Sequence, residues 1–174
     1  MANTPPCEEI ADQAGLAQVG AIVRTRLAGD PAVYKVPTDK AEIFAIGDFL
    51  SAAECQQLID MIDAVARPSS LHELDYASGF RTSFSGDLDP CDSFVMGIAR
   101  RIDDALGIDP TFGEPIQGQR YLPGQQFKPH NDWFYTSEKY WKLEKARGGQ
   151  RSWTAMAYLN TVEEGGDTHF THVG

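Results

Sequence analysis

The chain has 174 residues, of which 42% are hydrophobic and 23% are charged, as is typical of one globular domain with a buried core. Its net charge of -10, without a Lys/Arg cluster to offset it, argues against nucleic acid as a partner. No apolar run approaches the ~20 residues that cross a bilayer, and the acidic, polar first residues are unlike a signal peptide. We therefore expect no membrane partner.

The cysteines indicate the redox compartment of the protein. Cys7, Cys55 and Cys91 are odd in number and far apart, so they predict neither a disulfide framework nor a zinc site. Unpaired thiols are typical of a reducing compartment, and we expect a cytoplasmic location.

Helices are predicted in the first half of the chain. Apolar residues from Leu16 to Leu27 recur at helical spacing, and two further apolar stripes follow residues 51 and 90. A short strand is expected over 42–46. The residues that should begin or end these helices are Gly29, Ser51 with Glu54 as a capping box, Asp89 with Pro90, and Gly107.

After Gly113 the apolar pattern alternates with a period of two, which predicts strands. A polar, aromatic-containing insertion interrupts them over 136–149, and Gly165-Gly166 fits a tight turn. Helices followed by antiparallel strands indicate an α+β fold in which the helices pack on a sandwich or barrel. The expected strands are 117–122, 126–134, 152–160 and 167–171. We expect a single domain over 1–174, with a lead-in (1–40), a helical support (41–113) and a β part (114–174).

A candidate metal site lies in FKPHNDWF, residues 127–134. In a strand, residues two apart point to the same face, so His130 and Asp132 would project together. Two histidines and one carboxylate form the facial triad of non-haem iron oxygenases. Taken alone, this His-x-Asp pair is equally explained as two solvated polar residues in a loop.

The residues around this pair resemble a known family. They are the runs RYLPGQQFKPHNDWF (120–134) and GGQRSWTAMAYLNTVEEGGDTHF (148–170). Both are similar to the catalytic core of the prolyl 4-hydroxylase-like branch of the 2-oxoglutarate/Fe(II)-dependent dioxygenases. DFLSAAECQQLI (48–59) and FRTS (80–83) resemble the helical lead-in and the Arg-Thr-Ser segment of that family. The resemblance covers 40–174 and implies N-terminal helices on a double-stranded β-helix (jelly-roll) core, truncated at its C-terminal end.

The resemblance also implies site residues. His130 and Asp132 match two of the three iron ligands, and Tyr121 and Thr168 match residues that bind 2-oxoglutarate. Without the resemblance, Tyr121 would be read as a core aromatic residue and Thr168 as an ordinary strand residue. The residues that match substrate contacts are Arg81, Ser83 and Arg151. For these three the alternative is a surface salt bridge or a hydrogen bond in a turn.

In this family, Fe(II) and 2-oxoglutarate support hydroxylation of a C–H bond, and ascorbate keeps the iron reduced. The resemblance implies peptidyl proline as the substrate, with a small molecule as the alternative. Five aromatic residues could stack on a proline ring or pack the insertion onto the barrel. They are Trp133, Phe134, Tyr135, Tyr140 and Trp141.

The family's second histidine ligand and its basic 2-oxoglutarate-binding residue have no match in this sequence. Strand alternation gives only His172 the parity of an inward residue, whereas His72 and His169 are expected not to be ligands. We therefore expect a fragment of a longer oxygenase, with little activity of its own and exposed strands through which copies could pair. The alternative is a non-catalytic module that binds a partner through its exposed sheet edge.

Overall fold

The structure is a computed structural model that describes residues 11–69 and 79–173. Helices and small antiparallel sheets alternate in it, which confirms the predicted α+β class. The helices are α1 (Gln13–Ala28), α2 (Ala52–Val65), α3 (Ser93–Leu106) and α4 (Trp141–Arg147), with a 3-10 turn at Pro110–Phe112. The strands are β1 (Val33–Lys35), β2 (Phe44–Ile46), β3 (Arg67–Pro68), β4 (Phe84–Asp87) and β5 (Gln117–Arg120).

The ends of the helices follow local side-chain chemistry. At α2 the predicted capping box is present, because the Ser51 hydroxyl accepts from the Glu54 amide and the Glu54 carboxylate accepts from the Ser51 amide. The hydrogen bond from the Ser51 amide is the main reason that the pKa of Glu54 is lowered. At α3 the predicted start is three residues early: Asp89 caps a turn, and Asp92 accepts from the first amides of the helix. Gly107 ends α3 in the left-handed conformation, as predicted.

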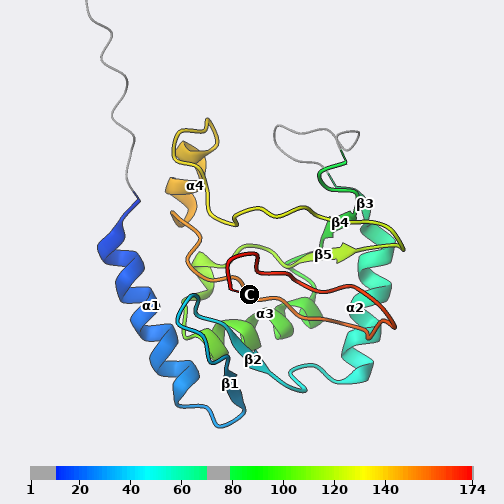
Figure 1. Cartoon of the computed structure of the whole chain (residues 1–174), viewed down its shortest axis with the longest axis horizontal. Coiled ribbons are helices and arrows are strands. Elements are labelled where there is room, and N and C mark those ends of the chain that lie inside the picture. Colours follow the sequence, from blue (N-terminus) through cyan, green and yellow to red (C-terminus); the bar gives the residue numbers. More distant parts are fainter. Residues whose placement is uncertain (1–10, 70–78, 174) are drawn as a thin grey trace, which may run out of the picture.

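Two small sheets are present in the described part of the chain. Strands β1 and β2 pair antiparallel, and β3, β4 and β5 form an antiparallel sheet in that order. Figure 1 shows α2 alongside the second sheet and α1 on the opposite side of the molecule, next to β1. The main core lies between α2, α3 and the second sheet. Its buried residues are Leu58, Ile62, Ala66, Leu88 and Val95.

Three of the predicted strands are not regular strands here. Residues 126–128 pair with 80–82 through one isolated bridge, Arg81 to Phe127. Residues 152–160 and 167–171 carry no ladder to another described strand. A strand is defined by aligned neighbouring N–H and C=O groups, so side-chain alternation alone does not produce one. The structure does not confirm a jelly-roll core, and nothing in it conflicts with one.

The segment 152–160 nevertheless keeps its two-residue pattern. Trp153 is tilted against Phe44 of β2 at 6.0 Å between ring centroids, and Leu159 packs on the main core. The chain then turns at Gly165 and Gly166, whose φ values of 74° and 76° confirm the predicted tight turn. Residues after this turn lie beside 152–160 (Figure 1), since the Tyr158 hydroxyl donates to Thr168 Oγ1 at 2.8 Å.

Among residues 11–69 and 79–173, no helix has the length and apolar character that are needed to cross a bilayer. Cys55 and Cys91 are free thiols, and Cys7 lies outside the described residues.

Gly118 of β5 should tolerate no side chain. A Cβ at this position would overlap the Ile62 side chain of α2. We expect Gly118→Ala to lower the free energy of unfolding by about 1–3 kcal/mol, as measured by urea denaturation, because the helix and sheet cannot approach as closely. The matched control is Gly97→Ala in α3, where a Cβ meets no atom within 4 Å. There, helix propensity should raise stability by up to about 1 kcal/mol. Equal effects of the two substitutions would contradict this packing argument.

Candidate metal centre

His130 and Asp132 point toward each other. His130 Nε2 lies 3.3 Å from Asp132 Oδ1, and both side chains are partly exposed. Two ligand atoms that are each about 2.1 Å from one ion, at right angles, are about 3 Å apart. The observed separation therefore fits two adjacent ligands of a single metal ion.

The other imidazole nitrogen determines which tautomer faces the carboxylate. His130 Nδ1 lies 2.8 Å from the carbonyl oxygen of Lys128. A carbonyl can only accept, so Nδ1 carries the proton and donates it. In the neutral ring Nε2 then has a free electron pair, and it faces a carboxylate oxygen that also offers electron pairs. A second proton on the imidazole, which makes the contact an ion pair, or a metal ion between the two atoms would each make this contact favourable. A backbone partner on the far nitrogen is also what a metal-binding histidine needs.

Asp132 is held from two sides. Its Oδ2 accepts a 2.9 Å hydrogen bond from the Thr154 hydroxyl, while Oδ1 faces His130. Its backbone carbonyl accepts from the Arg151 guanidinium at 3.0 Å. Both carboxylate oxygens therefore have defined directions.

Arg151 links this loop to the rest of the domain. Its guanidinium forms a two-pronged ion pair with Glu114, at 2.5 and 2.6 Å, and its Cζ lies 4.4 Å from the centre of the Phe134 ring. The hydrogen bond that Arg151 donates to Glu114 is the main reason that the pKa of Arg151 is raised. Planar pairing and stacking of this kind are specific to arginine.

Gln150 fixes the backbone just after the ligand pair. Its side-chain oxygen accepts from the Phe134 amide at 2.6 Å, and its side-chain nitrogen donates to the Phe134 carbonyl at 2.8 Å. The amide side chain thus pairs with Phe134 as a neighbouring strand residue would. This clamp explains part of what the Gly-Gly-Gln-Arg run contributes to the site.

Arg81 and Ser83 lie buried behind the site. Ser83 is fully buried, and its hydroxyl accepts from Arg81 Nε at 3.0 Å and is 3.0 Å from the Ser69 hydroxyl. Arg81 also lies 3.4 Å from the Gln117 side chain. Burial lowers the pKa of Arg81, and Tyr121 opposes the shift. The predicted substrate contact of both residues stays a prediction.

The two residues predicted to bind the co-substrate lie in separate local contacts. The Tyr121 hydroxyl donates to Gln119 at 3.0 Å, and the Tyr121 side chain is exposed. Thr168 accepts from Tyr158 and is directed at Met156 Sδ, 3.8 Å away. Each hydroxyl is thus engaged within the protein.

The aromatic residues after Asp132 divide into two groups. Phe134 packs edge to face on Tyr140 with centroids 5.9 Å apart, and Trp141 at the start of α4 is buried. Trp133 and Tyr135 are about half exposed. Packing of the insertion therefore explains three of the five, and two remain open to a ligand.

Several residues of this site were missed by the sequence reasoning. Thr154 and Tyr158 share the even-numbered side of 152–160, opposite the odd-numbered Trp153 and Leu159. The two-residue alternation was the available signal for both. Gln150 and Phe127 lie in the runs that carry the family resemblance, but the sequence alone did not indicate their contacts, and it gave no signal for Glu114.

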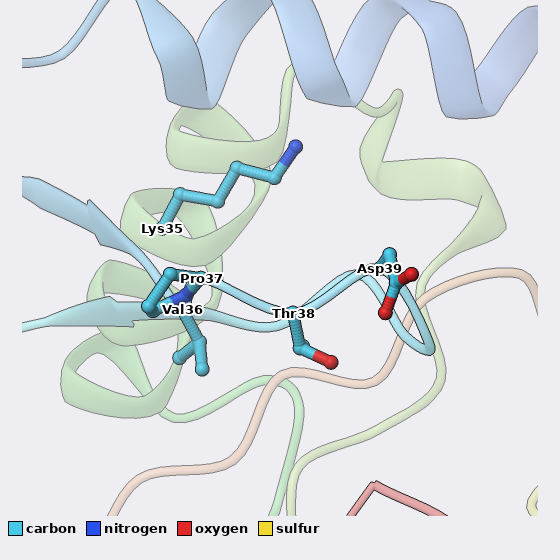
Figure 2. A pocket seen from close by; sticks show the side chains of 5 residues that line it. All are labelled: Lys35, Val36, Pro37, Thr38 and Asp39. Carbon is cyan, nitrogen blue, oxygen red and sulfur yellow. The ribbon is translucent and has the colours of Figure 1, made fainter.

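The described residues contain no cluster of three or more metal-ligating side chains around this pair. His72 lies outside the described residues. An open surface hollow lies instead at the end of β1 and along the segment that follows it, lined by Lys35, Val36, Pro37, Thr38 and Asp39 (Figure 2). None of these is a predicted site residue.

Several relatives of the chain are named prolyl 4-hydroxylases. Probable prolyl 4-hydroxylase 8 of Arabidopsis thaliana is 35% identical over 136 residues, which are 73% of this chain and 44% of that protein. Prolyl 4-hydroxylase 1 of the same plant is 34% identical over 143 residues, 76% of this chain and 47% of that protein. The Rattus norvegicus prolyl 4-hydroxylase subunit alpha-1 is 29% identical over 149 residues, 83% of this chain and 28% of that protein.

The chain belongs to the prolyl 4-hydroxylase-like branch of the 2-oxoglutarate/Fe(II) oxygenases. It spans less than half the length of the curated relatives it matches. No protein-family model matches it. Membership in this family confirms the resemblance from which the site residues were predicted. The family is one of oxidoreductases.

Gln150→Ala should loosen the backbone beside the ligand pair. It removes two hydrogen bonds to Phe134, each worth about 1 kcal/mol net, so we expect the Phe134 amide to exchange with solvent roughly tenfold faster. Gln125→Ala is the matched control, because the Gln125 side chain accepts from the Leu122 amide at 2.8 Å. It should speed exchange at Leu122 alone. Amide exchange followed by NMR separates the two, and faster exchange at both amides in either variant would contradict a local clamp.

Proposed function

We propose that this chain carries part of the active site of an Fe(II)- and 2-oxoglutarate-dependent dioxygenase that hydroxylates peptidyl proline. The observation that carries the proposal is the facing pair of acceptors, His130 Nε2 and Asp132 Oδ1, 3.3 Å apart. Homology to prolyl 4-hydroxylases supports the same assignment.

The donor set fits iron. One imidazole nitrogen and one carboxylate oxygen are the ligand types of the facial triad. Lys128 and Thr154 supply the outer hydrogen bonds that hold the two ligands in place. Iron held here would supply activation of O₂ together with 2-oxoglutarate, while ascorbate would keep it reduced. The protein's own task is to orient the ligands and leave the remaining coordination positions open.

The roles of the other site residues are part of this proposal. Tyr121 and Thr168 would bind 2-oxoglutarate through their hydroxyl groups, each of which now bonds a neighbouring side chain. Both would exchange that internal partner for the co-substrate. Arg151, Arg81 and Ser83 would contact the substrate. Arg151 is the most accessible of the three, because its side chain is 40% exposed whereas Arg81 and Ser83 are buried.

A peptide is the substrate class that we favour. Trp133 and Tyr135 follow Asp132 in the chain, and they are exposed to 53% and 52%. A flat aromatic surface next to the metal ligands suits a proline ring, which stacks without loss of side-chain freedom. The relatives are named prolyl 4-hydroxylases, which also supports proline as the target.

The metal site can be tested by anaerobic titration with Fe²⁺. We expect His130→Gln and Asp132→Asn each to weaken binding by more than about tenfold, since each removes a ligand atom. The matched controls are His169→Gln and Asp104→Asn, two exposed residues of the same types outside the pair. Binding that is unchanged in the first two variants, or equally weakened in all four, would show that iron is not held at this pair.

The reaction needs a separate assay. The protein as its source makes it would be incubated with Fe²⁺, 2-oxoglutarate, ascorbate, O₂ and a proline-rich peptide. Mass spectrometry should show one added oxygen atom per event in the peptide and an equal amount of succinate, both lost in Asp132→Asn. Succinate formed with a small molecule but never with the peptide would favour the small-molecule alternative.

A further inference from the structure

The aromatic ring of Phe127 lies directly on the His130 imidazole. Their centroids are 3.6 Å apart and their planes differ by only 19°. At this distance the two rings are in van der Waals contact over most of their area. One face of Phe127 is therefore occupied by His130.

The remaining sides of Phe127 are also held. The Arg81 guanidinium carbon lies over the ring, 4.6 Å from its centre, and must occupy the opposite face because His130 fills the first. Phe80 meets the ring edge to face, with centroids 5.9 Å apart and planes at 79°. Backbone pairing between 80–82 and 126–128 fixes the distance between the two segments that carry these groups. Phe127 thus has little freedom to rotate.

Arg81 is itself buried and hydrogen-bonded. Only 8% of its surface is exposed, and its guanidinium bonds the buried Ser83 hydroxyl and the Gln117 side chain. Ser83 and Gln117 hold the Arg81 guanidinium, which lies over the Phe127 ring. Phe127 in turn stacks on the His130 imidazole. Rigid support of this kind is what keeps a ligand ring in one orientation.

We infer that Phe127, clamped between Arg81 and His130, is a positioning residue that sets the plane of the His130 imidazole so that Nε2 faces Asp132. The hydrogen bond from Nδ1 to Lys128 fixes one point of the imidazole ring, which leaves rotation about that point open. The stack removes that rotation. The inference rests on the proposed function for its chemical purpose, whereas the geometry itself needs no metal.

The test has one readout without metal and one with it. In the metal-free protein, ring currents from Phe127 should displace the carbon-bound His130 protons upfield in NMR spectra. Phe127→Leu keeps an apolar side chain and should abolish that displacement. The same variant should weaken binding of Co²⁺ alone roughly tenfold, the usual size of an outer-shell effect. Phe127→Tyr keeps the flat ring and should restore both values.

Phe84→Leu is the matched control. Phe84 also lies under an arginine, Arg120, whose Cζ is 4.8 Å from the ring centre, but that pair is in the β3–β5 sheet. It should leave the His130 signals and Co²⁺ affinity at wild-type values. Unchanged His130 signals in Phe127→Leu would overturn the inference, and so would equal losses of Co²⁺ affinity in Phe127→Leu and Phe84→Leu. If wild-type protein binds no Co²⁺ yet shows the displaced signals, the positioning geometry stands and the proposed metal function fails.

Discussion

The antiparallel contact between 80–82 and 126–128 is the constraint on which the candidate site depends. Lys128 donates its amide to Phe80, Thr82 donates its amide to Gln126, and the Gln126 amide donates to the Thr82 hydroxyl. These bonds tie the segment that enters the site to residues just before β4. The sheet of β3–β5 is in turn pressed against α2 in the main core. The ligand loop therefore begins from a fixed point although it is not itself a regular strand.

Beyond that point the loop is held mainly by side chains. Arg151 and Gln150 reach the backbone of Asp132 and Phe134, and Thr154 reaches the Asp132 carboxylate. Charged and amide groups thus do what ladder hydrogen bonds do in a sheet. Bonds of this sort are directional, so they define orientation as well as position. Most of them come from 150–154, a short stretch just after α4.

Helix ends and the approach of His130 to Asp132 could be predicted from the sequence, because both depend on residues close together in the chain. Ser51 with Glu54 and Gly107 are local signals, and so is a histidine two residues before an aspartate. The start of α3 was misplaced because Asp89 and Asp92 are both good caps: Asp89 accepts from the Cys91 amide in a turn, and Asp92 caps the helix. Contacts such as Arg81 on Phe127 join residues 46 positions apart, a separation that no periodicity reports.

Ser83 has a consequence for how a substrate could be recognised. Its hydroxyl is wholly enclosed and already bonded to Arg81, with Ser69 beside it. A ligand that took the place of Arg81 at this hydroxyl would also draw the guanidinium away from the Phe127 ring. Contact with Ser83 would therefore alter the support behind the His130 ring, whereas contact with Arg151 would alter the hydrogen bond to the Asp132 backbone.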